Sequence, residues 1–254
     1  MAQKRFKDYK LDKSIYVVGS EQDFYFKQLF KALEILGFSK VNQLYHLSYE
    51  LVLDENMKKF SSRLGTAPLY SMLAKKAKEK ALKEVKKRNK NLSSKKQIEL
   101  ANKIAVGAML YLMLNKSNTK RIAFNLAEAL SYEGNTGPYL QYALVRANKI
   151  LKKAIVKPSL ANLDVLTSES EYELIKKISM FPIIIEKAAE NYSPHLVANY
   201  AYDLAKQFSN FYEKCQVIKA KDKLKKARLA LVSAFAQTLK NSLELLGINE
   251  VELM

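Results

Sequence analysis

The sequence predicts a mainly α-helical protein in which a helical bundle follows an incomplete α/β segment. Before Leu69, a β-branched run, a stretch with helical spacing and a second extended run follow one another. From Leu69 onward, nearly every apolar pattern has the helical period. Only seven Gly and five Pro occur among the 254 residues, which is too few for a loop-rich β-sandwich or a low-complexity chain.

The α/β segment begins with a predicted strand at 15–18, where Ile-Tyr-Val-Val is ended by Gly19. Apolar residues then recur at helical spacing until Gly37, namely Phe26, Leu29, Phe30, Leu33 and Leu36. Residues 44–53 alternate in part between apolar and polar and predict a second strand. A strand, a helix and a strand in this order indicate a parallel crossover. Because a two-stranded sheet is marginal by itself, we expect this segment to be the end of a larger α/β domain whose beginning is absent.

A strongly basic helical stretch follows at 75–103. It holds twelve basic residues, eleven Lys and Arg88, against three Glu, so that half of the net charge of +18 falls within it. Its apolar stripe is thin, consisting of Ala77, Ala81, Leu82 and Val85. The stretch is either a solvated helical face or a surface that follows a phosphate backbone.

The bundle is predicted from further helices at 98–114, 125–132 and 138–154 and, after a linker-like loop at 157–170, at 170–190, 194–213 and 221–246. Two of these carry apolar faces that we expect to be core: Val197, Tyr200, Leu204, Phe208 and Phe211 in one, and Leu231, Phe235, Leu239, Leu243 and Leu246 in the other.

The net charge indicates the class of partner. An excess of this size attracts phosphate backbones or anionic membrane surfaces. The longest apolar run, at 104–114, is too short to cross a bilayer, and the N-terminus has no apolar signal region. We therefore expect a cytoplasmic protein that binds nucleic acid and no membrane. A basic surface without a ligand is the alternative.

Cysteine and histidine are scarce. Cys215 is the single Cys, which excludes a disulfide scaffold and fits a reducing compartment. With His46 and His195 as the two imidazoles, a structural zinc site cannot be assembled, and we expect no protein-bound metal. We expect Cys215 to be a small buried residue.

Two segments have the composition of binding sites. Residues 58–65, Lys-Lys-Phe-Ser-Ser-Arg-Leu-Gly, combine cations, hydroxyls and a glycine, which suits a phosphate group, although such loops are also common surface loops. Residues 133–142 form a glycine- and proline-containing turn that opens a helix bearing Tyr139, Tyr142 and Arg146. Tyr and Arg on one helical face can stack on bases and bind phosphate, or they can be half-buried packing residues with polar tips.

These segments, in this order, resemble class I arginyl-tRNA synthetases. Residues 59–65 resemble the family's variant of the signature loop, and 133–142, Glu-Gly-Asn-Thr-Gly-Pro-Tyr-Leu-Gln-Tyr, match the stretch at the start of its anticodon-binding domain. Three further stretches match in order, at 16–28, 210–215 and 227–232, and the resemblance continues to Met254. It implies the C-terminal part of a Rossmann-like catalytic domain at 1–125 and a helical anticodon-binding domain at 126–254.

The resemblance also implies site residues. In the family, arginine and ATP form arginyl-adenylate, and the arginyl group then passes to tRNA. Lys59, Ser61, Ser62 and Arg63 would stabilise the pyrophosphate leaving group. Gln22 would line the arginine pocket, and His46 with Tyr49 the adenine side. ATP, with Mg²⁺, would be a substrate of the whole enzyme. The expected tRNA contacts are Lys86, Lys87, Arg88, Tyr139, Arg146, Tyr212, Arg228 and Met254.

Departures from the family pattern are equally informative. The His-Ile-Gly-His type motif and the upstream arginine-recognition residues are missing. Tyr25 stands where many members have His, Phe60 where Met is usual, and Glu50 where a small Gly is usual; a carboxylate at that place would repel a nucleotide phosphate. We therefore expect an arginine–tRNA ligase part that is inactive alone and needs an N-terminal half, supplied as a separate chain. A non-catalytic tRNA-binding module derived from the synthetase is the alternative, and a regulatory or structural subunit is a third.

Overall fold

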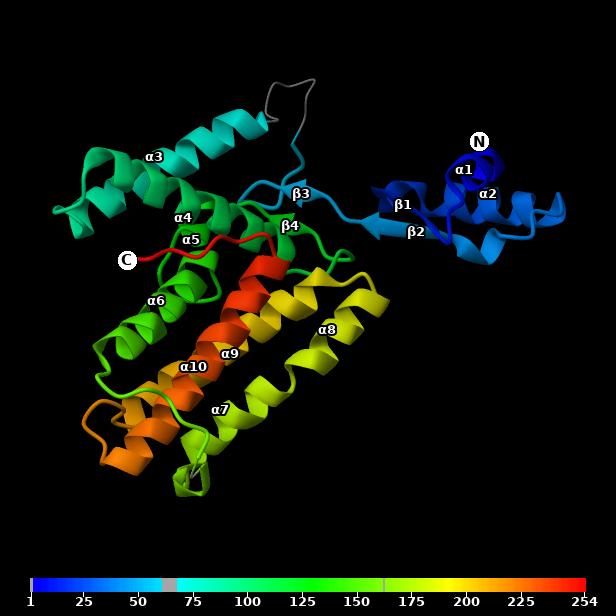
Figure 1. The fold of residues 1–254 in the computed structure, drawn as a ribbon. Coiled ribbons are helices and arrows are strands. Elements are labelled where there is room, and N and C mark those ends of the chain that lie inside the picture. Colours follow the sequence, from blue (N-terminus) through cyan, green and yellow to red (C-terminus); the bar gives the residue numbers. More distant parts are fainter. Residues whose placement is uncertain (1, 61–67, 162) are drawn as a thin grey trace. The chain divides into compact units, whose positions relative to one another are not determined.

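Residues 2–60, 68–161 and 163–254 are described by a computed structural model (Figure 1). They form two units. The first comprises 2–60 together with Ser117–Phe124, and the second comprises 68–116 together with Asn125–Met254. Within the described residues, no helix has both the length and the apolar character needed to cross a membrane.

The first unit contains the parallel crossover that the sequence predicts. Its elements are α1 (Ala2–Tyr9), β1 (Ser14–Gly19), the 3-10 turn η1 (Ser20–Gln22), α2 (Asp23–Ile35), η2 (Val41–Gln43) and β2 (Leu44–Tyr49). The strands β1 and β2 pair in parallel from Ser14↔Leu44 to Gly19↔Tyr49. Phe26 of α2 is buried beneath them, with its ring centroid 5.2 Å from that of Tyr16.

The second predicted strand is divided in the structure. Instead of one strand over 44–53, β2 ends at Tyr49, and β3 (Val52–Leu53) pairs in parallel with β4 (Ile122–Ala123) in a separate sheet. The prediction of a continuous strand was wrong because the backbone changes partner after Tyr49. The amide of Glu50 donates to the Asn118 carbonyl oxygen at 2.8 Å.

In the second unit, α3 (Tyr70–Arg88) and α4 (Ser94–Leu114) pack against each other. The thin apolar stripe predicted for the basic stretch makes the contact between the two helices. Its residues Ala77, Ala81 and Val85 are buried in one cluster with Leu100 and Ile104 of α4. The small alanine side chains allow the two helices to approach closely. The lysines of α3 are thereby left on the outer face.

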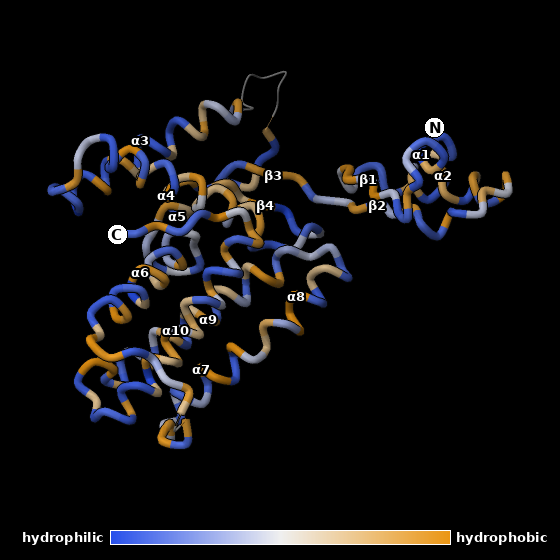
Figure 2. The backbone as a smooth tube through the Cα atoms, in the orientation of Figure 1, coloured by the Kyte–Doolittle hydropathy of each residue, from blue (hydrophilic) through white to orange (hydrophobic). Residues whose placement is uncertain are grey.

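The bundle consists of α5 (Leu126–Ala129), α6 (Gly137–Lys153), η3 (Leu163–Val165), α7 (Glu169–Ser179), α8 (Phe181–Glu190), α9 (Pro194–Lys214) and α10 (Asp222–Leu245). In Figure 1, α6, α9 and α10 run side by side, and Figure 2 shows apolar residues recurring at intervals along them. Both predicted apolar faces are buried, and so is Cys215, which confirms these predictions. The rings of Phe208 and Phe235 stack with centroids 3.9 Å apart.

Two predicted helices differ from those observed. The helix expected at 170–190 is divided at Met180 into α7 and α8, because Pro182 has no N–H to donate to the Ile178 carbonyl four residues earlier. The helix expected at 125–132 is a single turn, capped by the Asn125 side chain. The chain then turns through Gly134, whose φ is +80°, toward the start of α6.

Two contacts near the start of α6 fix this helix against its neighbours. At its start, Gly137 lies so close to the backbone of Gly107 in α4 that a Cβ atom would clash there. One turn later, the fully buried Gln141 donates through Nε2 to the carbonyl oxygens of Lys103 (3.3 Å) and Asn249 (2.8 Å). Gln141 therefore joins α4, α6 and the C-terminal residues.

Candidate nucleotide and RNA sites

Polar residues gather at the carboxyl edge of the β1–β2 sheet. This is the edge where ligands bind in parallel α/β folds. Ser20, Glu21 and Gln22 follow β1, and Glu50 follows β2. The Ser20 hydroxyl donates to Glu50 Oε1 at 2.7 Å. Lys59 comes from a third segment, and its Nζ lies 3.9 Å from Glu21 Oε1.

Lys59 is positioned by a tight turn. The Asp54 carboxylate accepts hydrogen bonds from the amides of Asn56 (2.9 Å) and Lys58 (2.8 Å), and Lys59 forms a bridge with Leu53. Its side chain is 67% exposed, so the ammonium group is open to an anionic ligand. The other predicted phosphate-binding residues, Ser61, Ser62 and Arg63, lie outside the described residues.

The three residues predicted to line the substrate pocket are placed differently. Gln22 and Tyr49 are exposed at the carboxyl edge, where their side chains could meet a ligand. His46 lies instead between the sheet and α2. Its Nε2 is 3.1 Å from the Val18 carbonyl oxygen, its Nδ1 is 3.3 Å from Asp23 Oδ1, and its ring stacks on Phe26 at 4.2 Å. These contacts turn His46 toward α2.

Glu50, the unexpected carboxylate, is paired. Besides the hydrogen bond from Ser20, its Oε2 lies 3.5 Å from Nε of Arg121. The Ser20 hydrogen bond and, to a lesser extent, Arg121 hold the pKa of the Glu50 carboxyl below its usual range. No local pattern in the sequence indicates Arg121 as a site residue, because its pairing with Glu50 depends on the distant β3–β4 contact.

A cavity of about 530 Å³ lies in the second unit between α6, the end of α9 and residues 215–219. Its lining includes four cations, Arg146, Lys149, Lys153 and Lys219, and no carboxylate among the described residues. Ile150, Val217 and Ile218 supply apolar surface. The size is that of a small-ligand site, and the lining combines positive charge with apolar groups.

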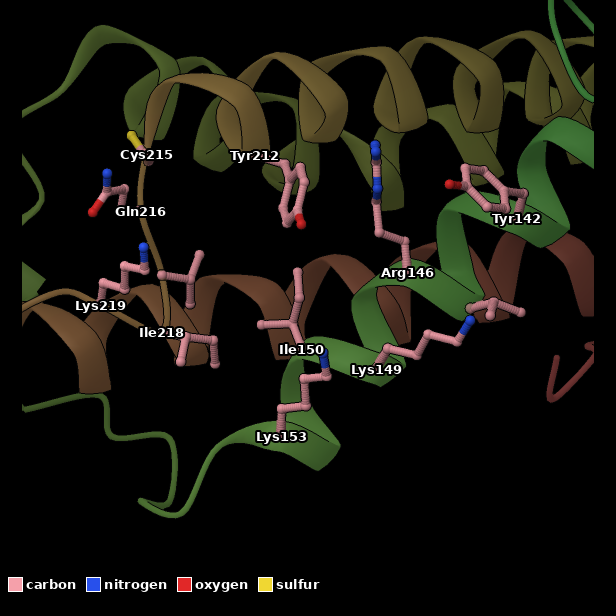
Figure 3. A pocket seen from close by; sticks show the side chains of 12 residues that line it. Tyr142, Arg146, Lys149, Ile150, Lys153, Tyr212, Cys215, Gln216, Ile218 and Lys219 are labelled. Atoms are coloured by element: carbon pink, nitrogen blue, oxygen red, sulfur yellow. The ribbon is translucent and has the colours of Figure 1, made fainter. Parts of the chain in front are cut away.

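Two tyrosines flank the central arginine of this cavity. The guanidinium carbon of Arg146 is 4.4 Å from the ring centroid of Tyr212 and 5.6 Å from that of Tyr142. Figure 3 shows Arg146 between the two rings. Tyr212 is 40% and Tyr142 37% exposed, so both rings present surface on which a base could stack.

Lys149 and Lys153 were not predicted as site residues, although their spacing in the sequence indicates a shared face. Together with Tyr142 and Arg146, they recur at helical spacing along α6, and Figure 3 shows both lysines on the helix that bears Arg146. The third lysine, Lys219, follows α9, and only the folded structure brings it to the cavity.

Three other predicted RNA contacts have mainly internal partners. The Tyr139 hydroxyl is 3.3 Å from Ser209 Oγ, and Met254 packs against the cluster that contains Val251. Arg228 is only 14% exposed at its side chain. Its Nε donates to Glu171 Oε1 at 2.6 Å and its Nη1 to the Gln216 carbonyl oxygen at 2.8 Å. The structure thus turns Arg228 inward.

The end of α3 presents the predicted basic contacts. Lys86 and Lys87 are exposed in its last turn. Arg88 is engaged locally: its Nε lies 3.7 Å from Glu84 and its guanidinium 4.3 Å from the ring centroid of Tyr132. Across the described parts of the chain, no three His, Cys, Asp or Glu side chains are grouped as metal ligands.

Two family sequence models match the chain. Residues 1–126 match the catalytic domain of class I tRNA synthetases of the arginine type, and residues 140–254 match the DALR anticodon binding domain. The chain belongs to the class I arginyl-tRNA synthetase family. It corresponds to the C-terminal part of the proteins in that family. The domain boundary expected between residues 125 and 126 lies near the end of the first match, at residue 126. The packing of the helices, in contrast, joins α3 and α4 to the bundle.

Individual arginine–tRNA ligases are similar over nearly the whole chain. The enzyme of Clostridium botulinum (strain Alaska E43 / Type E3) is 41% identical over 251 residues, which are 98% of this chain and 44% of that relative. The enzyme of Borrelia hermsii (strain HS1 / DAH) is 42% identical over 250 residues, 96% of this chain and 42% of the relative. This arginyl-tRNA synthetase family member therefore spans less than half the length of the curated relatives it matches.

Solved arginyl-tRNA synthetases share the fold. The Thermus thermophilus arginyl-tRNA synthetase matches with a TM-score of 0.84 and 32% identity, over 96% of this chain and 42% of that structure. The Plasmodium falciparum enzyme matches with a TM-score of 0.77 and 27% identity, over 98% of this chain and 43% of that structure. A helical bundle with a small α/β segment, as predicted, is thus the C-terminal fold of the arginyl-tRNA synthetase family.

Proposed function

We propose that the chain is the C-terminal part of an arginine–tRNA ligase, in which the second unit binds tRNA and the first contributes to the ATP site. This proposal rests on the cavity between α6 and residues 215–219, which we call the Arg146 cavity. It combines two tyrosine rings, a guanidinium group and three lysines, and it lies within the region that matches the anticodon binding domain.

The cavity is suited to a single-stranded, unstacked nucleotide. A base can stack on the exposed face of Tyr142 or Tyr212, while Lys149, Lys153 and Lys219 attract the phosphates on either side of it. Arg146, already held between the rings, has donors for a base edge or a phosphate oxygen. Lys86 and Lys87 would extend the positive surface for the tRNA backbone. Tyr139 and Met254 would have supporting roles at most, given their packing.

The carboxyl edge of the first unit is the proposed ATP side. Lys59, with Ser61, Ser62 and Arg63 that follow it in the sequence, would stabilise the pyrophosphate as it leaves, and Mg²⁺ would accompany ATP as part of the substrate. Gln22 and Tyr49 would face arginine and adenine, respectively. The exposed ammonium group of Lys59 supports this assignment. Because Arg121 and Ser20 engage the Glu50 carboxylate, its repulsion of a phosphate would be reduced.

Catalysis would require the residues that the relatives carry beyond the matched span, in the same polypeptide or in a separate chain that acts as a partner. The tRNA partner would be arginine-accepting, and the protein would act in the cytoplasm, where tRNA is charged. We expect no arginine-dependent pyrophosphate exchange from residues 1–254 alone. We expect tRNA arginylation when a polypeptide with the remaining synthetase motifs is added. Exchange by residues 1–254 alone would contradict this division of labour.

A non-catalytic tRNA-binding module is the second candidate, and Glu50 at the proposed phosphate edge favours it. Both candidates predict binding of a hairpin with the anticodon-arm sequence of an arginine-accepting tRNA, with an affinity that falls as salt rises. They differ in the complementation assay: a module would bind the hairpin but never support arginylation. If the chain fails to bind the hairpin, both candidates are rejected.

A further inference from the structure

Residues 215–219 form the wall of the Arg146 cavity that faces α6. They connect the end of α9 to the loop before α10 and contribute Gln216 and Lys219 to the lining (Figure 3). No helix or strand runs through this wall. Backbone hydrogen bonds hold its two ends, from the Cys215 amide to the Phe211 carbonyl oxygen and from the Ala220 amide to the Val217 carbonyl oxygen. Around Gln216, the position of the wall depends on side-chain contacts as well. Those contacts come from elements outside the cavity.

Besides the buried side chain of Val217, two side-chain contacts from other helices hold the wall. The thiol of Cys215 is buried, 3.3 Å from Ser170 Oγ at the start of α7. The backbone of the next residue is held from α10, where Arg228 Nη1 donates to the Gln216 carbonyl oxygen at 2.8 Å. Arg228 itself is fixed by its 2.6 Å hydrogen bond to Glu171 Oε1.

Glu171 completes the chain of contacts. Its side chain is 1% exposed, and its Oε2 accepts a hydrogen bond from the Ser168 amide at 2.8 Å, which caps α7. Removing Arg228 would leave a buried carboxylate without its cation and would release the Gln216 carbonyl group. The loss of Arg228 would therefore change the position of the cavity wall, although Arg228 does not line the cavity.

We propose that Arg228 is a positioning residue for RNA binding: paired with Glu171, it sets the 215–219 wall and does not contact the RNA. This inference rests on the proposed RNA-binding function of the cavity. It assigns to Arg228 a role opposite to the direct contact that its positive charge suggests.

Salt dependence separates the two roles. A phosphate contact releases counterions, so its loss lowers the slope of log affinity against log salt by about 0.7 for single-stranded RNA. For Arg228→Met we expect about tenfold weaker binding of the anticodon-arm hairpin with an unchanged slope. Arg228→Lys, which keeps a donor for one of the two acceptors, should recover part of the affinity. A reduced slope in Arg228→Met, or an unchanged affinity, would overturn the proposal.

A double-mutant cycle with Glu171→Gln provides the second readout. If Arg228 positions the wall through Glu171, the two single variants weaken binding similarly and the double variant is no weaker than either. If Arg228 contacts the RNA, Glu171→Gln frees the guanidinium group and leaves the affinity unchanged or higher, and the proposal fails. Circular dichroism checks that each variant is folded. Should Arg228→Met not fold, Arg228→Lys and Glu171→Gln are compared by the same slope and affinity criteria.

Arg146→Ala distinguishes failure of this inference from failure of the proposed function. Arg146 lines the cavity, so its loss should both weaken hairpin binding and reduce the salt slope. If the unaltered chain binds no hairpin, or if Arg146→Ala binds like the unaltered chain, the RNA site itself is wrong. If Arg146→Ala behaves as expected and Arg228→Met reduces the slope as well, only the positioning role is wrong.

Discussion

At the scale of single residues, Arg146 and Arg228 show how partners determine the role of the same side chain. Arg146 is flanked by tyrosine rings in an open cavity without a carboxylate among its described lining residues. Arg228 has a buried carboxylate at 2.6 Å and a carbonyl oxygen at 2.8 Å. The first arginine retains donors for a ligand, whereas the second uses its donors inside the protein.

Tyr212 provides a test of base stacking. Because base–aromatic stacking contributes about 1–3 kcal/mol per base, we expect Tyr212→Ala to weaken binding of the anticodon-arm hairpin about tenfold. Tyr212→Phe keeps the ring and should bind like the unaltered chain. Fluorescence anisotropy with the labelled hairpin measures both affinities. Equal losses in the two variants would show that the hydroxyl, and not stacking, is responsible.

Glu50 provides a test of pH dependence in the first unit. The pKa of its carboxyl is lowered in the folded state, so ionised Glu50 stabilises the fold above the ordinary carboxylate pKa, and this contribution is lost as the pH falls through the lowered value. Glu50→Gln should therefore be less stable than the unaltered chain at about pH 7, with the difference fading toward about pH 3.

Thermal unfolding of both proteins across this range measures the difference. The exposed Glu55, replaced by Gln, controls for the general effect of removing one negative charge. A stability difference for Glu50→Gln that is the same at both pH values would show that the carboxylate is not stabilised by Ser20 and Arg121.

At the scale of secondary-structure elements, α3 packs on the protein through one face and exposes cations on another. Its alanines and Val85 pack on α4, while Lys86 and Lys87 are exposed. We expect the double variant Lys86→Glu and Lys87→Glu to weaken hairpin or tRNA binding and to flatten its salt dependence, by about 0.7–0.9 in slope for each phosphate that is no longer neutralised. The same charge change at the exposed Lys4 and Lys7 of α1 is the control. Equal effects of the two pairs would indicate general repulsion and not a specific surface.

Elements with a strong local signal were predictable from the sequence. The β-branched run at 15–18 and the helical spacing of the α9 and α10 faces gave the parallel crossover and the bundle core, because burial on one face enforces these periods. The β3–β4 pair could not be predicted. Each of its strands has two residues, and its partners are about 70 positions apart, so no local period records the pairing.

The residues of the candidate sites likewise fall into two groups: those that share one helix can be predicted from the sequence, and those that come from distant segments cannot. Tyr142 and Arg146 lie one turn apart on a single helix, and their shared face can be read from the sequence. The opposite wall at 215–219 is positioned by Glu171 and Arg228, which are 57 residues apart in the chain. The family resemblance implies a tRNA contact for Arg228. Its internal partner becomes visible only when α7 and α10 are packed together.

At the scale of the whole molecule, the first unit has an unusual sheet. Parallel sheets normally have both faces covered, but here one face leaves Ile15 40%, Val17 61% and Tyr49 49% exposed. A two-stranded sheet with one covered face gains little from burial. We therefore expect the amides of β1 and β2 to exchange hydrogen faster than those of α9 and α10, as measured by hydrogen exchange with mass spectrometry. Comparable protection in the four elements would contradict this.

The discontinuity of both units has a practical consequence. After Phe60 the polypeptide contributes α3 and α4 to the second unit, returns to the first for Ser117–Phe124, and leaves it again. A truncation that starts at residue 126 would discard α3 and α4 and remove most of the buried cluster that contains Val145. Excision of the helical unit for crystallisation or RNA-binding assays should therefore start at 68, and the short excursion at 117–124 is the place where a designed linker could replace the chain.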